Sequence, residues 1–436
     1  MSALATLWRG AATAIAPLLL LHLRRRAARG QEIAERLPER RGHGAARPPG
    51  PLLWMHAASV GETASILPLI EALARRRPDL TFLLTTGTVT SAALLAQRLP
   101  AALAPRVLHR FVPLDVPGWA ARFLDGWRPD AAVFVESELW PNLIGAAAAR
   151  GVPLALVNAR MSPRSARWWA RAPGLARAVL SRFRLVLAQT EADAARLRSL
   201  GTAAECPGNL KYAALPLPAD GAELARLRVM IGDRPAWLAA STHPGEEAIA
   251  IAAHRRLSAA HPGLLTVIVP RHPERGAEVA ALAGDLPTTR RAAGGDPTPG
   301  TAIHVADTLG ELGLFYRLAR AAFIGGSLVP HGGQNPLEPA RLGCPVIVGP
   351  HTWNFAEIMD RLAAAGGLLR LPAGPDPAAG LAEAVSAMLT LPERGRAQAE
   401  AAARLAAEEA GLPDRIATAL LPLLPGAEEE AAAPGG

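Results

Sequence analysis

Two groups of carboxylates follow apolar runs in this sequence, and they are the residues best placed to do chemistry. Glu62 follows Gly61 in the turn between an expected strand and helix, and Glu136 and Glu138 follow the apolar run 129–135. At the carboxyl end of a strand, a carboxylate can act as a base or stabilise a cationic transition state. The alternatives are a first-turn glutamate that complements a helix dipole, for Glu62, and solvated loop charges for the other two.

A second kind of chemistry, anion binding, is indicated in the other half of the chain. Arg271 and His272 follow the apolar run 264–269 and suit a phosphate. The stretch 322–350 holds two glycine pairs, and the second leads into Asn335–Glu338, where Asn335 is expected to cap a helix that begins at Pro336. Backbone N–H groups in such loops can bind a phosphate, and Glu338 could accept hydrogen bonds from a ribose. An ordinary strand-to-helix turn remains the alternative, because glycine motifs alone are weak evidence.

Lys211 is the only lysine among the 46 basic residues of the chain. A compact ammonium cannot always be replaced by a planar guanidinium, so this lysine is a candidate for a specific role. The alternative is that a lysine has remained at this position by chance.

Composition narrows the class of protein. The chain has 436 residues, a net charge of +8 and a pI near 10.8, which indicates an anionic partner. The basic residues are scattered and no nucleic-acid-binding signature is present, so a nucleic-acid partner is not expected. Cys206 and Cys344 match no metal or disulfide spacing, and the sequence has neither an HExxH motif nor a DxD pair. We therefore expect no metal and a reducing compartment.

Alternating strands and helices position these residues. Strands are expected at 51–56, 81–86, 129–135, 153–158, 185–189, 236–240, 264–269, 321–324 and 345–348, with helices such as 64–76 and 248–261 between them. This alternation, which stops and restarts once, predicts two doubly wound α/β domains with a ligand cleft between them. The expected limits are 27–212 for the first domain, 213–222 for a linker, 223–425 for the second domain and 426–436 for a disordered tail.

The first 26 residues are expected to be a membrane anchor. The apolar run 11–21 is followed by Arg24-Arg25-Arg26, which places the following domain on the cytoplasmic side. The run is short for a bilayer span, and a cleaved signal peptide is the alternative, although its charges would normally come first.

Ten segments, in order, resemble the 3-deoxy-D-manno-octulosonic acid (Kdo) transferase family. They are HAASVGET (56–63), ESELWPN (136–142), NARMS (158–162), GNLKY (208–212), STHPGEE (241–247), PRHPER (270–275), LGEL (309–312), GGS (325–327), GGQNPLEPA (332–340) and GPHTWNF (349–355). The resemblance spans nearly the whole chain. It implies a GT-B glycosyltransferase, with two Rossmann-like domains facing across a cleft, an N-terminal anchor, and no cofactor.

The resemblance also implies roles for individual residues. Glu62 matches the catalytic proton acceptor, and Glu136 and Lys211 match residues that stabilise the transition state. The segments that hold CMP match Arg271, His272, Leu309, Gly310, Glu311, Asn335, Pro336, Leu337 and Glu338.

The implied reaction is metal-independent, inverting transfer of Kdo from CMP-Kdo to the lipid A precursor, tetraacyldisaccharide 1,4'-bisphosphate, in lipopolysaccharide core biosynthesis. The first domain would bind the acceptor and the second CMP-Kdo, at the cytoplasmic face of the inner membrane and its phospholipid. The alternatives are another GT-B nucleotide-sugar glycosyltransferase or epimerase, a non-catalytic membrane-bound nucleotide-sugar binder with no need of Glu62, and a nucleic-acid binder suggested by charge alone.

Overall fold

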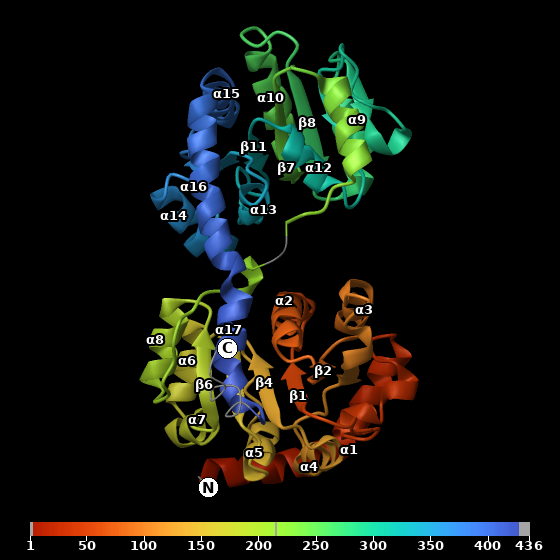
Figure 1. The fold of residues 1–436 in the computed structure, drawn as a ribbon, viewed down its shortest axis with the longest axis vertical. Coiled ribbons are helices and arrows are strands. Elements are labelled where there is room, and N and C mark those ends of the chain that lie inside the picture. Colours follow the sequence, from red (N-terminus) through yellow and green to blue (C-terminus); the bar gives the residue numbers. More distant parts are fainter. Residues whose placement is uncertain (1–2, 214–215, 427–436) are drawn as a thin grey trace, which may run out of the picture. The chain divides into compact units, whose positions relative to one another are not determined.

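The chain folds into two compact units, each built around its own parallel sheet. The computed structural model describes residues 3–213 and 216–426 (Figure 1). Within these residues, the first unit comprises 3–213 together with 409–426, and the second unit comprises 216–408. The two sheets confirm the predicted α/β class with a Rossmann-like unit in each half.

The first unit contains a six-stranded sheet in the order β3-β2-β1-β4-β5-β6, with every neighbouring pair parallel. Its strands are β1 (Leu52–His56), β2 (Thr81–Thr86), β3 (Val107–Phe111), β4 (Ala131–Val135), β5 (Leu154–Ala159) and β6 (Phe183–Ala188). Its helices are α1 (Ala3–Ala28), α2 (Val60–Arg76), α3 (Val89–Arg98), α4 (Pro117–Trp127), α5 (Pro141–Ala149), α6 (Pro163–Ala170), α7 (Pro173–Leu180), α8 (Glu191–Ser199) and α17 (Leu412–Leu420).

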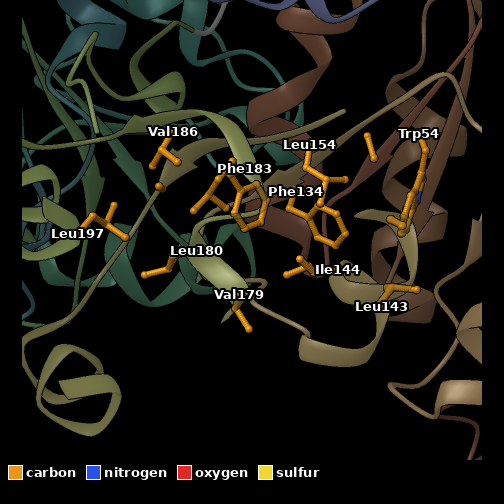
Figure 2. Close-up of a cluster of buried hydrophobic side chains, with 14 of the residues drawn as sticks. Trp54, Phe134, Leu143, Ile144, Leu154, Val179, Leu180, Phe183, Val186 and Leu197 are labelled. Atoms are coloured by element: carbon orange, nitrogen blue, oxygen red, sulfur yellow. The ribbon is translucent and has the colours of Figure 1, made fainter. Parts of the chain in front are cut away.

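Both faces of this sheet are buried, as a parallel sheet requires. Alternate residues of β1 point to opposite faces, so that Leu52 and Trp54 join one hydrophobic cluster while Leu53 and Met55 join the other. Figure 2 shows part of the first cluster, in which Phe134 packs among side chains from β5, β6, α5 and α7. The sheet edge that carries the loops after β1 and β4 is therefore held rigidly from both sides.

The second unit contains a seven-stranded parallel sheet in the order β13-β12-β11-β7-β8-β10-β9. Its strands are β7 (Ala236–Thr242), β8 (Leu265–Pro270), β9 (Thr288–Arg290), β10 (Ile303–Val305), β11 (Ala322–Ile324), β12 (Val346–Val348) and β13 (Leu369–Arg370). Its helices are α9 (Gly221–Ile231), α10 (Glu246–Leu257), α11 (Gly276–Leu282), α12 (Leu312–Leu318), α13 (Leu337–Ala340), α14 (Ala356–Ala364), α15 (Pro377–Thr390) and α16 (Pro392–Ala410), the last of which ends beyond the unit's limit.

The division of the chain differs from the predicted domain limits in two places. Helix α9 begins at Gly221, inside the predicted linker 213–222. Helix α17, which the prediction assigned to the second domain, belongs to the first unit, where Leu412, Ile416 and Leu420 pack with residues of α2. The apolar spacing of α17 says only that one face is buried, and it cannot say against which sheet. Residues 427–436 of the predicted disordered tail lie outside the described residues.

Helix α1 lies along the first unit. It packs against α4 and α7 (Figure 1). The Trp8 Nε1 donates to Asp115 Oδ2 at 3.1 Å, and Leu23 is buried. Among the described residues, one helix is long and apolar enough to cross a membrane by length and composition alone, and it is Thr6–Ala28 of α1. Several of its large apolar side chains are exposed, with Leu7 at 68% and Leu18 at 67%.

The packing of α17 predicts that Ile416→Ala destabilises the first unit. Ile416 is 1% exposed, and truncating a buried isoleucine to alanine costs about 2–5 kcal/mol. Denaturant unfolding, with hydrogen exchange to assign the loss to strands β1–β6, measures the effect. Thr418→Ala, at an exposed position of the same helix, is the control. An unfolding free energy unchanged by Ile416→Ala would contradict the assignment of α17 to this unit.

Candidate active site

The predicted carboxylates of the first unit come from loops that follow two neighbouring strands. The loop after β1 leads into α2 and carries Glu62, and the loop after β4 carries Glu136 and Glu138. Since β1 and β4 pair in parallel, their carboxyl ends meet at the same sheet edge. Glu62 is 8% exposed and Glu136 is 7% exposed, so both are buried acids.

Glu62 lies within the first turn of α2, which begins four residues earlier than the predicted Ala64 because Ser59 caps it. The Ser59 Oγ accepts from the Glu62 backbone N–H at 3.3 Å and donates to Glu62 Oε1 at 2.8 Å. Glu62 Oε2 accepts from the Ala58 N–H at 2.8 Å. This reciprocal arrangement is a capping box, which fixes the side chain in one position.

The surroundings of Glu62 favour its protonated form more than water would. Burial raises the pKa of Glu62, and the nearby charges of Glu138 and Glu136 raise it further, against the hydrogen bonds from Ser59 and Ala58 that lower it. A carboxylate whose pKa moves upward is a better proton acceptor near neutral pH than a solvated glutamate. Glu62 thus caps the helix and also has a raised proton affinity.

Glu136 and Lys211 form an ion pair, with Nζ 2.6 Å from Oε1. Glu136 is nearly buried, while the lysine side chain is 40% exposed. The turn η4 (Leu210–Tyr212) presents the lysine, and Asn158 holds this turn by accepting from the Leu210 N–H at 2.9 Å. The structure therefore brings together two residues that lie 75 positions apart in the sequence.

His56 is a residue of this site that the sequence analysis did not select. Its Nε2 lies 3.2 Å from Glu138 Oε2, and the Trp140 Nε1 donates to the same oxygen at 2.5 Å. Burial alone would raise the pKa of Glu138, but the hydrogen bond and charge of His56, with the bond from Trp140, outweigh it and lower the pKa. The signal available in the sequence was the position of His56 at the end of β1, six residues before Glu62.

Strained backbone occurs at the ends of three strands, two in the first unit and one in the second. Glu136, Asn158 and Ser241 have φ values of 56°, 54° and 54°, in the left-handed region that residues other than glycine seldom adopt. Such conformations persist where the surrounding structure enforces them, and they concentrate at functional sites.

The predicted nucleotide-binding residues of the second unit also lie on loops after neighbouring strands. Arg271 and His272 follow β8, residues 309–311 follow β10, and Asn335–Glu338 follow β11. Because the sheet order is β11-β7-β8-β10, these loops share one sheet edge. Burial raises the pKa of Glu338, while the positive charges of Arg341 and Arg271 oppose the shift. Arg271 itself is exposed and available to an anion.

Two details of these loops differ from the prediction. Helix α13 begins at Leu337, one residue after the predicted Pro336, and Asn335 Oδ1 accepts from the Leu337 N–H at 3.0 Å. The carboxylate of Glu311 forms an ion pair with Arg291 at 2.6 Å and accepts from Thr308 Oγ1. Arg291 thereby lowers the pKa of Glu311.

The first glycine loop does not present free amides to a phosphate, contrary to the expectation from the sequence. The buried carboxylate of Glu246 accepts from the N–H groups of Gly326, Ser327 and Leu328 at 2.6, 3.0 and 2.9 Å, and from His243 N–H at 2.9 Å. Burial raises the pKa of Glu246, and these four backbone bonds oppose the shift. Glu246 thus ties the loop after β11 to the loop after β7.

His243, which the sequence did not single out, lies near the loops that are predicted to bind the nucleotide. Its ring centroid is 3.8 Å from that of His331, and Gln334 Nε2 lies 3.0 Å from His243 Nε2. Burial and the neighbouring charges of His331, His272 and Arg271 lower the pKa of His243 to about 4. Within the described residues, no group of three or more histidines, cysteines or acids is arranged to hold a metal ion.

Two parallel-sheet units, with buried acids on the loops of the first and the exposed Arg271 on a loop of the second, have the architecture of the GT-B class. The fold is similar to that of UDP-GlcNAc 2-epimerase from Neisseria meningitidis bound to UDP-GlcNAc, with TM-score 0.58 and 14% identity, covering 85% of this chain and 100% of that chain. A putative UDP-N-acetylglucosamine 2-epimerase from Listeria monocytogenes gives TM-score 0.56 and 15% identity, over 88% of this chain and 98% of that chain.

Sequence relatives identify the family within this class. The family model of 3-Deoxy-D-manno-octulosonic-acid transferase (kdotransferase) matches residues 35–214. The chain is 36% identical to the 3-deoxy-D-manno-octulosonic acid transferase of Haemophilus influenzae, over 94% of this chain and 96% of the relative, and 40% identical to that of Bordetella pertussis, over 93% and 96%. The chain belongs to the 3-deoxy-D-manno-octulosonic acid transferase family.

The Glu246 network predicts that Glu246→Leu destabilises the second unit. The substitution leaves four backbone donors without their acceptor, and each buried unsatisfied group costs about 1–3 kcal/mol. Denaturant unfolding of the purified variant measures the loss. The control is Glu274→Gln, because the Glu274 side chain is 74% exposed. A Glu246→Leu protein as stable as the parent would show that the loop does not depend on this carboxylate.

Proposed function

We propose that this glycosyltransferase transfers Kdo from CMP-Kdo to the lipid A precursor, a phosphorylated and acylated disaccharide, in lipopolysaccharide core biosynthesis. The first unit binds the acceptor, and the second unit holds the CMP of the donor. The observation that carries the proposal is the buried Glu62, fixed by its capping box, in the same unit as the Glu136–Lys211 ion pair. Membership in the Kdo transferase family supports Kdo as the sugar that is transferred.

Glu62 acts as the proton acceptor in this mechanism. It removes the proton of an acceptor hydroxyl as that oxygen attacks the anomeric carbon of Kdo. The bond from the anomeric carbon to the CMP phosphate breaks, and CMP leaves with the electron pair. A direct displacement of this kind inverts the anomeric configuration. The raised pKa of Glu62 supports the assignment, because it brings proton affinity closer to what a general base needs.

The Glu136–Lys211 pair stabilises charge that develops in the transition state. The carboxylate is adjacent to a positive centre as the oxocarbenium-like sugar forms, and the ammonium meets the negative charge of the departing phosphate. The pairing at 2.6 Å supports the proposal, since each group holds the other in one orientation before substrate arrives. The exposed fraction of Lys211 leaves its ammonium accessible to a ligand.

The donor nucleotide is held by Arg271, His272, residues 309–311 and residues 335–338. The arginine guanidinium suits the CMP phosphate, and Glu338 suits ribose hydroxyls. The ion pair of Glu311 with Arg291 leaves the backbone of the 309–311 loop, rather than this carboxylate, to contact the nucleotide. Gly310 has φ 86°, which allows that backbone to turn toward a ligand.

The site of action proposed for this enzyme is the cytoplasmic face of the inner membrane. Helix α1 carries exposed apolar side chains and has basic residues, Arg25 and Arg26, in its last turn, which suits phospholipid headgroups. An acylated acceptor resides in the membrane, so a catalytic unit attached to that surface meets its substrate there.

A second candidate is a UDP-sugar enzyme of the same GT-B class, which the similarity to UDP-GlcNAc 2-epimerases favours. Competition by free nucleotides separates the two. The Kdo transferase proposal expects CMP to bind and UDP not to bind, and the epimerase alternative expects the reverse.

Glu62→Gln is predicted to lower turnover by about 10²–10⁴-fold, because the substitution keeps the shape and removes the base. Stability at neutral pH is not expected to fall. The folded-state pKa of Glu62 is raised, so the stabilisation from its protonated form is present below the ordinary glutamate range and lost as pH rises through the raised pKa. A glutamine side chain does not ionise, so it keeps this stabilisation as pH rises, and glutamine also fits a capping box.

Transfer assays with CMP-Kdo and the lipid A precursor, followed by mass spectrometry of the product, measure the turnover. Glu71→Gln, on the same helix, is the matched control. Near-normal turnover of Glu62→Gln with a stability loss of roughly 0.3–1 kcal/mol would leave Glu62 only its helix-capping role. Glu136 or Glu138 would then become the first candidate for the base.

The reaction is predicted to proceed in excess chelator. The proposal assigns charge stabilisation to Lys211 and Arg271, and no DxD pair is available in the sequence to hold a metal-bound nucleotide. Initial rates with and without a chelator such as EDTA should agree. Loss of activity that a divalent cation restores would contradict the metal-free mechanism.

A further inference from the structure

A pocket of about 610 Å³ opens beside Glu62, and helix α1 forms part of its wall. Leu19, Leu23 and Arg26 of α1 line the pocket on one side. Glu62 and Glu138 line it as well, so the pocket reaches the carboxylates of the candidate active site. All of its lining residues belong to the first unit.

We propose that this pocket is the acceptor site and that α1 is a wall of it, rather than only an attachment to a membrane. The ligand is an amphipathic glycolipid that carries a phosphate, with its sugar at the carboxylates and its apolar part along α1. The inference rests on the proposed function, because it assigns a substrate class to the site of Glu62.

The lining of the pocket is itself amphipathic. Leu19, Leu23, Val112, Leu114 and Trp140 contribute apolar surface, while Glu62 and Glu138 contribute acids. A purely hydrophilic sugar phosphate would leave the leucines in contact with water, and a simple lipid would bury the acids without a partner. A sugar joined to an acyl chain satisfies both parts.

Charge at the same pocket suits a phosphate. Arg26 Nε lies 3.1 Å from Glu32 Oε1, and Arg40 Nη2 lies 3.0 Å from Glu32 Oε2. At Glu32, two guanidinium groups share one carboxylate, whereas Glu62 and Glu138 contribute acids elsewhere in the lining of the pocket. Arg40 is buried, but the Arg26 side chain is 32% exposed and can also reach an anion.

The face of α1 that points away from the first unit also carries apolar side chains. Leu18 is 67% exposed and Leu21 is 45% exposed, whereas Leu23 is buried against the unit. The face that the proposed function assigns to the membrane and the face that lines the pocket thus belong to one helix. An acylated acceptor can remain in contact with α1 while its sugar reaches Glu62.

Neighbouring leucines of α1 provide a matched test in the full-length protein. Leu19→Trp fills the pocket, whereas Leu18→Trp adds the same bulk to the exposed face. Binding of tetraacyldisaccharide 1,4'-bisphosphate in detergent is measured without donor, and CMP binding is measured alongside. Leu19→Trp is expected to weaken glycolipid binding by about tenfold or more, with CMP binding unchanged, because over-filling a packed site excludes the ligand. Leu18→Trp is expected to match the parent.

A smaller substitution covers the case in which Leu19→Trp does not fold. Leu19→Ala should weaken binding of the acylated disaccharide and leave binding of its deacylated form unchanged, since only the acylated ligand contacts the leucine. Parent-like glycolipid binding by both Leu19 variants would overturn the proposal, as would a parent protein that does not bind the glycolipid.

The same proteins separate this inference from the proposed function. If the parent transfers Kdo and the Leu19 variants bind and react like the parent, α1 is not a wall of the acceptor site and the proposed reaction stands. If the parent binds the glycolipid through Leu19 and transfers no Kdo, the pocket stands and the proposed reaction fails.

Discussion

The burial of one carboxylate, Glu62, is the constraint on which the account of the first unit depends. Burial at this position disfavours the ionised form of the Glu62 carboxyl group. Hydrogen bonds from Ser59 and from the Ala58 amide nevertheless hold the side chain in place at the start of α2. The rigid sheet edge makes this possible, because β1 and β4 are packed on both faces. The result is a carboxyl group that is fixed in position and raised in proton affinity, as the proposed role of a base requires.

The second unit uses a buried carboxylate differently. Glu246 accepts four backbone hydrogen bonds, and these join the loops after β7 and β11. The residues predicted to bind the nucleotide lie on neighbouring loops of the same sheet. One acid is therefore assigned to chemistry and another to architecture, and only their contacts distinguish them.

The sequence predicted the alternation of strands and helices well because the central strands are continuous apolar runs. It missed β3, β9 and β13, whose burial is partial, and β10, whose three residues include His304 in place of an apolar side chain. These edge or short strands lack the apolar run that identified the others. Helix α17 was misassigned because its partner sheet comes from the far end of the chain.

The candidate site was predicted less completely than the fold. The roles of Glu62, Glu136 and Lys211 came from the family resemblance. The residues alone gave carboxylates at strand ends, a single lysine and the anion-binding candidates Arg271 and His272. The contacts of His56, Glu246 and His243 come from segments distant in sequence, such as Glu138 and the 326–328 loop. No local pattern distinguishes a histidine or glutamate with such partners from one that faces solvent.

The pH dependence of transfer tests the central role of Glu62 most directly. The rate of transfer is predicted to fall on acidification, because protonated Glu62 cannot accept a proton. The midpoint of this fall should lie at a pH above the ordinary pKa range of glutamate. Ser59→Ala removes a hydrogen bond that lowers the pKa of Glu62, so it should move that midpoint to higher pH. Thr190→Ala, which removes the cap of α8 instead, should leave it unchanged. A midpoint that does not respond to Ser59→Ala would contradict the assignment of Glu62 as the base.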